Sequence, residues 1–134
     1  MDKKTSRLSC WRVLYILDVD NMGVKSKFYG LTKCLYPGQT IDIGHRMKEH
    51  LQNIGCKFLS TNFRDARRKL VFVDYMFGTE DDVSVEEDRF KALKRSQKLK
   101  LIESDRNKLV AYKPCKAIIL KKNGNESEQV CIKL

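Results

Sequence analysis

Residues 43–54 read IGHRMKEHLQNI, and this stretch decides between two fold classes. Its apolar residues recur at intervals of four, four and three positions: Ile43, Met47, Leu51 and Ile54. This spacing is the period of one face of an α-helix. Residues 86–95 (EEDRFKALKR) also suit a helix, because acidic side chains come first and basic ones last, in agreement with the helix dipole. Alternation of strands and helices would imply a parallel sheet.

Most other segments have the length and composition of β-strands. Residues 10–17 (CWRVLYIL) and 69–75 (KLVFVDY) are rich in β-branched and aromatic side chains, and 98–102 (KLKLI) alternates between charged and apolar residues. The chain ends in a predicted hairpin with Asn123-Gly124 at its turn. Five further segments are also predicted as strands: 28–35, 41–43, 56–60, 108–112 and 115–120. Because strands outnumber helical stretches, we predict an all-β sandwich with one insertion of helical period.

Length and charge limit the organisation of the chain. Its 134 residues suit one domain, predicted over 10–134 behind a flexible N-terminus at 1–9. The 27 basic and 17 acidic side chains give a net charge of +10, which favours polyanionic partners. No apolar run approaches the ~18 residues of a membrane span. Asp18 and Asp20 interrupt the first apolar stretch, so a signal peptide is not expected either.

The cysteines and histidines predict no metal site and no cofactor. The five cysteines form no C-x-x-C pair, and their odd number argues against a disulfide framework, so a reducing compartment is expected. His45 and His50 are five positions apart and lack the spacing of a helical metal pair.

One alternative is a Mg²⁺-dependent nuclease of the PIN or NYN type. Asp18, Asp20 and Asn21 follow an apolar strand, and carboxylates at such a strand end supply oxygen ligands for Mg²⁺. Further acids would have to come from later segments, with Asp74, Asp81 and Asp82 as candidates. The other interpretation of the same residues is a turn shaped by Asp and Asn side chains.

Two loops carry residues suited to a phosphate. Gly44-His45-Arg46 follows one predicted strand, and Gly78-Thr79 follows another. An arginine beside a Gly-Thr turn binds a phosphate through its planar guanidinium, with hydroxyl and backbone N–H groups completing the site. The acidic residues between 80 and 88 lie between basic clusters, and this segregation makes direct binding of DNA a less favoured alternative.

The order of these segments resembles a forkhead-associated (FHA) domain from Trp11 to about residue 120. The similar segments are CWRVLYIL, LYPGQTIDIGHR, QNIGCKFLSTNF, KLVFVDYMFGTEDD and LKLIESDRNKLVAY. The resemblance implies a β-sandwich that reads phosphothreonine with an arginine, a serine and an asparagine on its loops. In this chain the corresponding positions hold His45 and Arg46, Asn53 with Cys56, and Asp82 beyond Gly78-Thr79. An acid at that last position would repel a phosphate, so the implied pocket is weakened or lost.

The sequence therefore predicts a non-catalytic protein–protein interaction module in the nucleus. Its expected partner is a phosphorylated peptide or another subunit of a DNA double-strand-break repair or chromosome-associated complex, with no membrane involved. The residues expected to contact the partner are His45, Arg46, Asn53, Gly78, Thr79 and Asp82. The alternatives are the nuclease described above and a DNA-binding or BRCT-like module.

Overall fold

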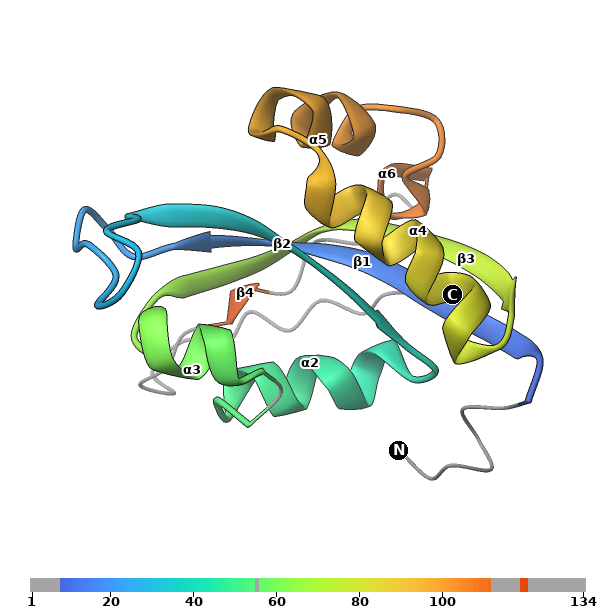
Figure 1. The fold of residues 1–134 in the computed structure, drawn as a ribbon, viewed down its shortest axis with the longest axis horizontal. Helices are drawn as coiled ribbons and strands as arrows, with labels where there is room; N and C mark the ends of the chain where they lie inside the picture. Colours follow the sequence, from blue (N-terminus) through green and yellow to red (C-terminus); the bar gives the residue numbers. More distant parts are fainter. Residues whose placement is uncertain (1–7, 55, 112–118, 121–134) are drawn as a thin grey trace.

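The computed structural model describes residues 8–54, 56–111 and 119–120, and its centre is an antiparallel sheet (Figure 1). Strand β1 (Cys10–Asp20) lies between β2 (Lys33–Thr40) and β3 (Arg67–Gly78), and the two-residue β4 (Ile119–Leu120) pairs with β3. Both long neighbours run antiparallel to β1, so β2 and β3 point in the same direction on either side of it. Residues 1–7 of the expected flexible N-terminus and the predicted terminal hairpin beyond residue 120 lie outside the described residues.

Helices cover both faces of this sheet. On one face lie α2 (Ile43–Leu51) and α3 (Lys57–Asn62), which connect β2 to β3. On the other face lie α4 (Glu80–Ala92) and α5 (Arg95–Ile102), and the short α6 (Lys108–Ala111) packs against β3. In the described part of the chain, no helix combines the length and the apolar composition needed to cross a membrane.

Strand β1 supplies side chains to two separate cores, because successive residues of a strand point to opposite faces. Tyr15 and Leu17 belong to the core under α2 and α3, together with Met47 and Leu59. The second core lies under α4 and α5 and is built by Leu14, Ile16, Leu35, Phe72, Val83 and Phe90. Burial on both faces explains why residues 13–17 are all apolar.

Side-chain caps fix the starts of the two longest helices. The Asp42 carboxylate accepts a hydrogen bond from the backbone N–H of His45 (3.0 Å), which begins α2. Thr79 and Asp82 form a reciprocal capping box at the start of α4. The hydrogen bonds from Thr79 also lower the pKa of Asp82. The helical period of residues 43–54 and the charge order of 86–95 thus predicted helices where α2 and α4 occur.

The predicted all-β class is confirmed only for the antiparallel sheet. Residues 56–60, 98–102 and 108–112 were predicted as strands, but α3, α5 and α6 occupy most of these positions. In α5 the Gln97 side chain accepts a hydrogen bond from the backbone N–H of Lys94 (2.9 Å), and this cap begins a helix where the alternation of 98–102 indicated a strand. Residues 28–32 form part of a loop, so β2 begins later than expected.

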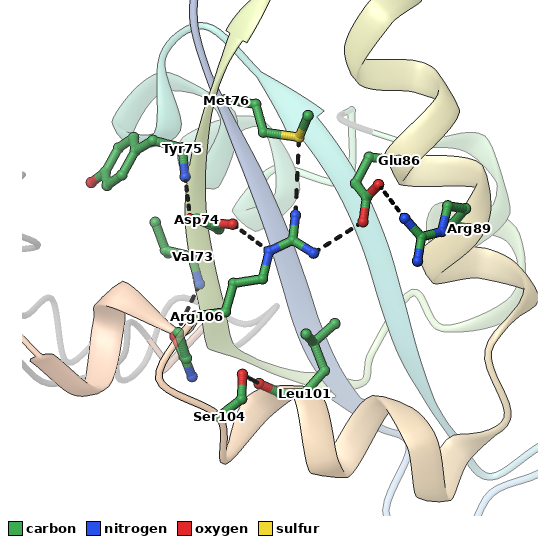
Figure 2. Close-up of polar contacts among 10 residues, drawn as sticks. Val73, Asp74, Tyr75, Met76, Glu86, Arg89, Leu101, Ser104 and Arg106 are labelled. Carbon is green, nitrogen blue, oxygen red and sulfur yellow. Dashed lines mark hydrogen bonds and ion pairs between the residues drawn. The ribbon is translucent and has the colours of Figure 1, made fainter.

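Two neighbouring residues attach the C-terminal helices to β3. Arg106 makes ion pairs with Asp74 (2.5 Å) and Glu86 (3.0 Å), and Figure 2 shows its guanidinium between these two carboxylates. The buried Asn107 donates to the carbonyls of Val71 and Ile102 (both 2.8 Å), and its side-chain oxygen accepts from Val73 (3.2 Å). These bonds hold the segment after α5 against the strand.

Candidate active site

A tyrosine, a histidine and an arginine meet on the α2 side of the sheet. The Oη of Tyr15, on β1, lies 2.8 Å from Nε2 of His50, and Nε of Arg46 donates to the same oxygen over 3.3 Å. Arg46 and His50 are four positions apart on α2, so they lie on the same face of the helix. Packing of α2 on β1 therefore brings both side chains to one phenol.

Gly38 makes room for the Tyr15 ring. The two residues are paired across β1 and β2, and a Cβ built on Gly38 would lie 2.4 Å from both Cζ and Oη of Tyr15. Real Cβ atoms essentially never approach other heavy atoms so closely, so the ring lies directly over the glycine backbone. Any larger residue at position 38 would displace the hydroxyl from its two partners.

His50 is neutral at physiological pH. It is fully buried, and this burial, followed by the positive charges of Arg46 and Arg68, lowers the pKa of His50 to about 3. Its Nδ1 has no hydrogen-bond partner among the residues described. Because Arg46 donates to the Tyr15 oxygen, we assign the phenol proton to the bond with Nε2 of His50, which places the imidazole proton on Nδ1.

Tyr15 holds its proton in the resting state. Burial raises the pKa of Tyr15 to about 12, and the charge of Glu87 adds to this increase, whereas Arg46 opposes it. The charge of Glu87 on α4 therefore reaches the phenol from the opposite layer of the fold. Helix α4 is held on β2 by a hydrogen bond from Gln39 to Ser84 (2.7 Å), one turn before Glu87.

Glu87 and Arg46 have different exposure and partners. The Glu87 side chain is 15% exposed and pairs with Lys91 (2.9 Å). The Arg46 side chain is 28% exposed and pairs with Glu49 (3.4 Å). Arg46 is thus the group on the Tyr15 hydroxyl that solvent reaches, while Tyr15 and His50 lie beneath it.

Tyr36 completes the wall of the site. It lies on β2, and its ring packs edge-on against His50 with the centroids 6.0 Å apart. Burial, and then the thiol of Cys56, raise the pKa of Tyr36. Both phenols are therefore protonated at neutral pH. We call the residues that surround the Tyr15 hydroxyl or act on its charge the site cluster: Tyr15, Tyr36, Arg46, His50 and Glu87.

The residues predicted from the sequence are placed in three groups. His45 and Arg46 both lie on α2 and contact Glu49. Asn53 ends the turn after α2 with a positive φ of 60°, donates to the carbonyl of Arg64 and accepts from Arg68. Gly78, Thr79 and Asp82 lie together at the junction of β3 and α4, where Thr79 and Asp82 build the capping box and Gly78 lies against Asp82. Of the six, only Arg46 belongs to the site cluster.

The carboxylates of the nuclease alternative lie apart from one another. In the register of β1 and β3, Asp18 and Asp20 lie opposite Lys69 and Arg67 at one end of the sheet. Asp81 and Asp82 belong to α4, which starts after the other end of β3. About ten residues of strand, roughly 30 Å, separate the two ends. Asp20 accepts from the backbone N–H of Met22 and so shapes a turn. Within the described residues, no group of three or more His, Cys, Asp or Glu side chains forms a metal site.

Comparison with known proteins identifies no family for this chain. No family model matches the chain, and no match was found among curated proteins or solved structures.

The sequence pattern raised His50 only as a possible metal ligand together with His45, and it indicated Tyr15 only as part of a strand. The spacing of Arg46 and His50 on a helix of predicted period was the one signal that pointed to the cluster.

Proposed function

We propose that this chain is a nuclease domain that hydrolyses phosphodiester bonds with the site cluster. The observation that carries the proposal is the convergence of Arg46 and His50 on the Tyr15 hydroxyl, at 3.3 and 2.8 Å. A hydroxyl in contact with a neutral imidazole and a guanidinium is an arrangement suited to proton transfer beside an anion. The net charge of +10 favours a polyanionic substrate.

Arg46 is the group best placed to bind the phosphate. Its planar guanidinium matches two phosphate oxygens, and it stays charged at every physiological pH. When it turns from Tyr15 toward a phosphate, the phenol beneath it becomes accessible to the attacking water. The same movement of Arg46 thus binds the substrate and exposes Tyr15.

The proton of the attacking water passes to Tyr15 while Tyr15 gives its own proton to Nε2 of His50. The water oxygen forms a new bond to phosphorus, the bond to the leaving oxygen breaks, and the leaving oxygen takes a proton from solvent. His50 then returns its proton to Tyr15, and Tyr15 releases one to solvent, so both groups end in their starting protonation states. A bound phosphate offsets part of the positive charge of Arg46, one of the causes of the low pKa of His50. Binding therefore weakens one cause of the low pKa of His50, while burial, the largest cause, still lowers it.

A divalent cation at this site would be held by the substrate phosphate and by water, since Mg²⁺ usually keeps several waters and binds phosphates directly. Glu87 lies on α4, on the other face of the sheet from α2, and pairs with Lys91 (2.9 Å), so it is not counted among the ligands of that cation. The cation would compensate the negative charge that develops on the phosphate.

Cleavage of end-labelled single-stranded, duplex and branched DNA, with Mg²⁺ or with EDTA, tests the proposal. We expect Mg²⁺-dependent cleavage that falls by about 10²–10⁴ in Tyr15→Phe and His50→Gln. Arg46→Ala should also abolish most of the activity. The control is His45→Gln, which changes an exposed neighbour on the same helix that makes no contact with Tyr15 in the described structure.

Absence of cleavage on all three substrates, or equal activity in Tyr15→Phe, would overturn the nuclease proposal. The FHA-like interaction module, similar to the N-terminal domain of nibrin, would then be the remaining prediction. That prediction implies a β-sandwich, whereas the described residues form one sheet with helices on both faces, so its support would have to come from binding of phosphothreonine peptides through Arg46 and Thr79. Peptide titration of the Arg46→Glu variant distinguishes the two functions, because only the interaction module depends on phosphothreonine.

A further inference from the structure

The loop between β1 and β2 carries two aromatic side chains that are held in solvent. Phe28 is 65% exposed and Tyr29 is 62% exposed, although both rings are large and apolar. Neither is needed to fill a core. Aromatic rings exposed next to each other are common where proteins bind partners with flat, stackable surfaces.

This loop is anchored by a set of hydrogen bonds. The backbone N–H of the buried Ser26 donates to the carbonyl of Leu31, and the Ser26 Oγ accepts from the N–H of Leu31 (3.0 Å). The backbone N–H of Phe28 donates to the side chain of Asn62 on α3 (3.3 Å). These bonds hold the backbone of the loop that carries the two rings.

The charged residues within the loop are all basic, and Asp20 directly precedes them. Residues 21–41 contain three lysines and no aspartate or glutamate. Lys25, Lys27 and Lys33 are all exposed, as is Lys57 at the start of α3. The ammonium group of Lys27 lies 5.3 Å from the centre of the Phe28 ring. Basic groups interleaved with exposed aromatics form a surface suited to a nucleic acid backbone and its bases.

A row of aromatic contacts connects this loop with the site cluster. The Tyr29 ring packs on Phe58 of α3 with centroids 5.4 Å apart, and Phe58 stacks on Tyr36 at 6.4 Å with an interplanar angle of 12°. Tyr36 in turn contacts His50. The loop lies next to α3 in Figure 1, and the same face of the sheet carries α2 with Arg46.

We propose that the β1–β2 loop binds unpaired nucleotides, with bases stacked on Phe28 and Tyr29 and phosphates on Lys25, Lys27 and Lys33. The inference rests on the proposed nuclease function and names its substrate class: nucleic acid with a single-stranded segment beside the bond that is cleaved. A duplex hides its base faces, so it would use the lysines but not the rings. The three lysines of the loop favour a polyanion, although Asp20 lies at its start.

Binding of a short fluorescein-labelled oligothymidylate, measured by anisotropy in EDTA so that no cleavage occurs, tests the rings. We expect Phe28→Ala and Tyr29→Ala each to weaken binding roughly 10-fold, because base stacking is sequence-tolerant and strong. Tyr29→Phe keeps the ring and should bind as the wild type. The matched control is Phe77→Ala, which removes a ring of similar exposure (60%) at the opposite end of β1.

The salt dependence of the same binding tests the lysines. For single strands, log K falls with log salt with a slope of about −0.7 per phosphate contacted. Lys27→Gln should therefore make the slope shallower by roughly 0.7. Lys100→Gln, an exposed lysine on α5, should leave the slope unchanged.

Three results would overturn this assignment: binding that Phe28→Ala and Tyr29→Ala do not change, an equal loss in Phe77→Ala, or tighter binding of duplex than of single strands through the same rings. A chain that binds oligothymidylate through the loop but cleaves no substrate contradicts the nuclease proposal alone. A chain that cleaves while Phe28→Ala binds normally contradicts the loop assignment alone.

Discussion

The phenol ring of Tyr15 lies against the backbone of Gly38, its partner across β1 and β2, so closely that the site for a Cβ is already occupied by Cζ and Oη at 2.4 Å. The pairing of β1 with β2 and the small size of Gly38 therefore place the hydroxyl next to α2, where it contacts His50 and Arg46. The glycine belongs to the site as much as the side chains do.

Gly38→Ala should impair both the site and the fold. The added methyl group must push the Tyr15 ring or separate the strands, which we expect to cost about 1–3 kcal/mol of unfolding free energy. Urea denaturation measures this cost. Gly44→Ala is the control, because its Cβ would meet only the Asp42 carboxylate at an ordinary 3.6 Å. Equal stability of the two variants would contradict the close approach.

Stability should fall as the pH is lowered from about 6.5 to about 3, and His50 should contribute to this fall. Burial, Arg46 and Arg68 lower the pKa of His50 to about 3 in the folded chain, while the unfolded chain takes up the proton near 6.5. In this window the unfolded state binds more protons, so acid favours unfolding by up to about 1.4 kcal/mol per pH unit. Urea titrations at several pH values measure the slope.

His50→Gln should flatten this part of the pH dependence, since the proton uptake is removed. His45→Gln alters a histidine whose side chain is 71% exposed and should leave the dependence as it is. If His50→Gln had the same slope as the wild type, the imidazole would not be the buried neutral group described here.

Asn107→Asp should destabilise the chain by about 2–4 kcal/mol, because a carboxylate cannot donate to the carbonyls of Val71 and Ile102. Hydrogen exchange should show loss of protection at the Val73 amide, which donates to this side chain. The same substitution at Asn21, whose side-chain amide donates to Val24 at an exposed turn, should cost less than about 1 kcal/mol. A small effect at Asn107 would mean that α6 is held by its apolar contacts.

Arg106→Gln should cost about 1–2 kcal/mol, since it leaves the buried Asp74 without its cation and removes the contact with the Phe90 ring. We expect a small loss of unfolding free energy because solvent reaches about a third of the Arg106 side chain and screens the ion pair. The double variant Asp74→Asn/Arg106→Gln should recover part of the loss, and urea denaturation gives the coupling. Arg89→Gln, an exposed partner of the same Glu86, is the control.

Long segments with a single strong pattern were predictable from the sequence. The apolar run of β1 and the alternation in β3 indicated strands, and the spacing of Ile43, Met47 and Leu51 predicted α2. The prediction of a strand at residues 98–102 was wrong because a pattern of five residues fits both the strand period and the helix period. In the fold, Leu101 and Ile102 contact the core under α4 while Leu99 is 43% exposed, a division that only the helix explains.

The candidate site was hidden because its parts are far apart in the chain. Tyr15 and His50 are 35 positions apart, and nothing in a strand rich in aromatics distinguishes a tyrosine that meets a histidine from one that fills a core. Gly78 and Thr79 suggested a phosphate loop because helix caps use the same residue types, and Asp82, which was expected to repel a phosphate, is the other half of the capping box. Arg46 was identified from its charge, while its partners required the packing of α2 on β1.

Strand β2 forms one rim of the described sheet, and Pro37 lies within it opposite Ile16. Proline has no amide hydrogen, so a second molecule aligning with this rim would meet an interruption in the row of donors it needs. The chain should therefore resist edge-to-edge aggregation there, which keeps the margin beside Tyr36 accessible even in concentrated solution.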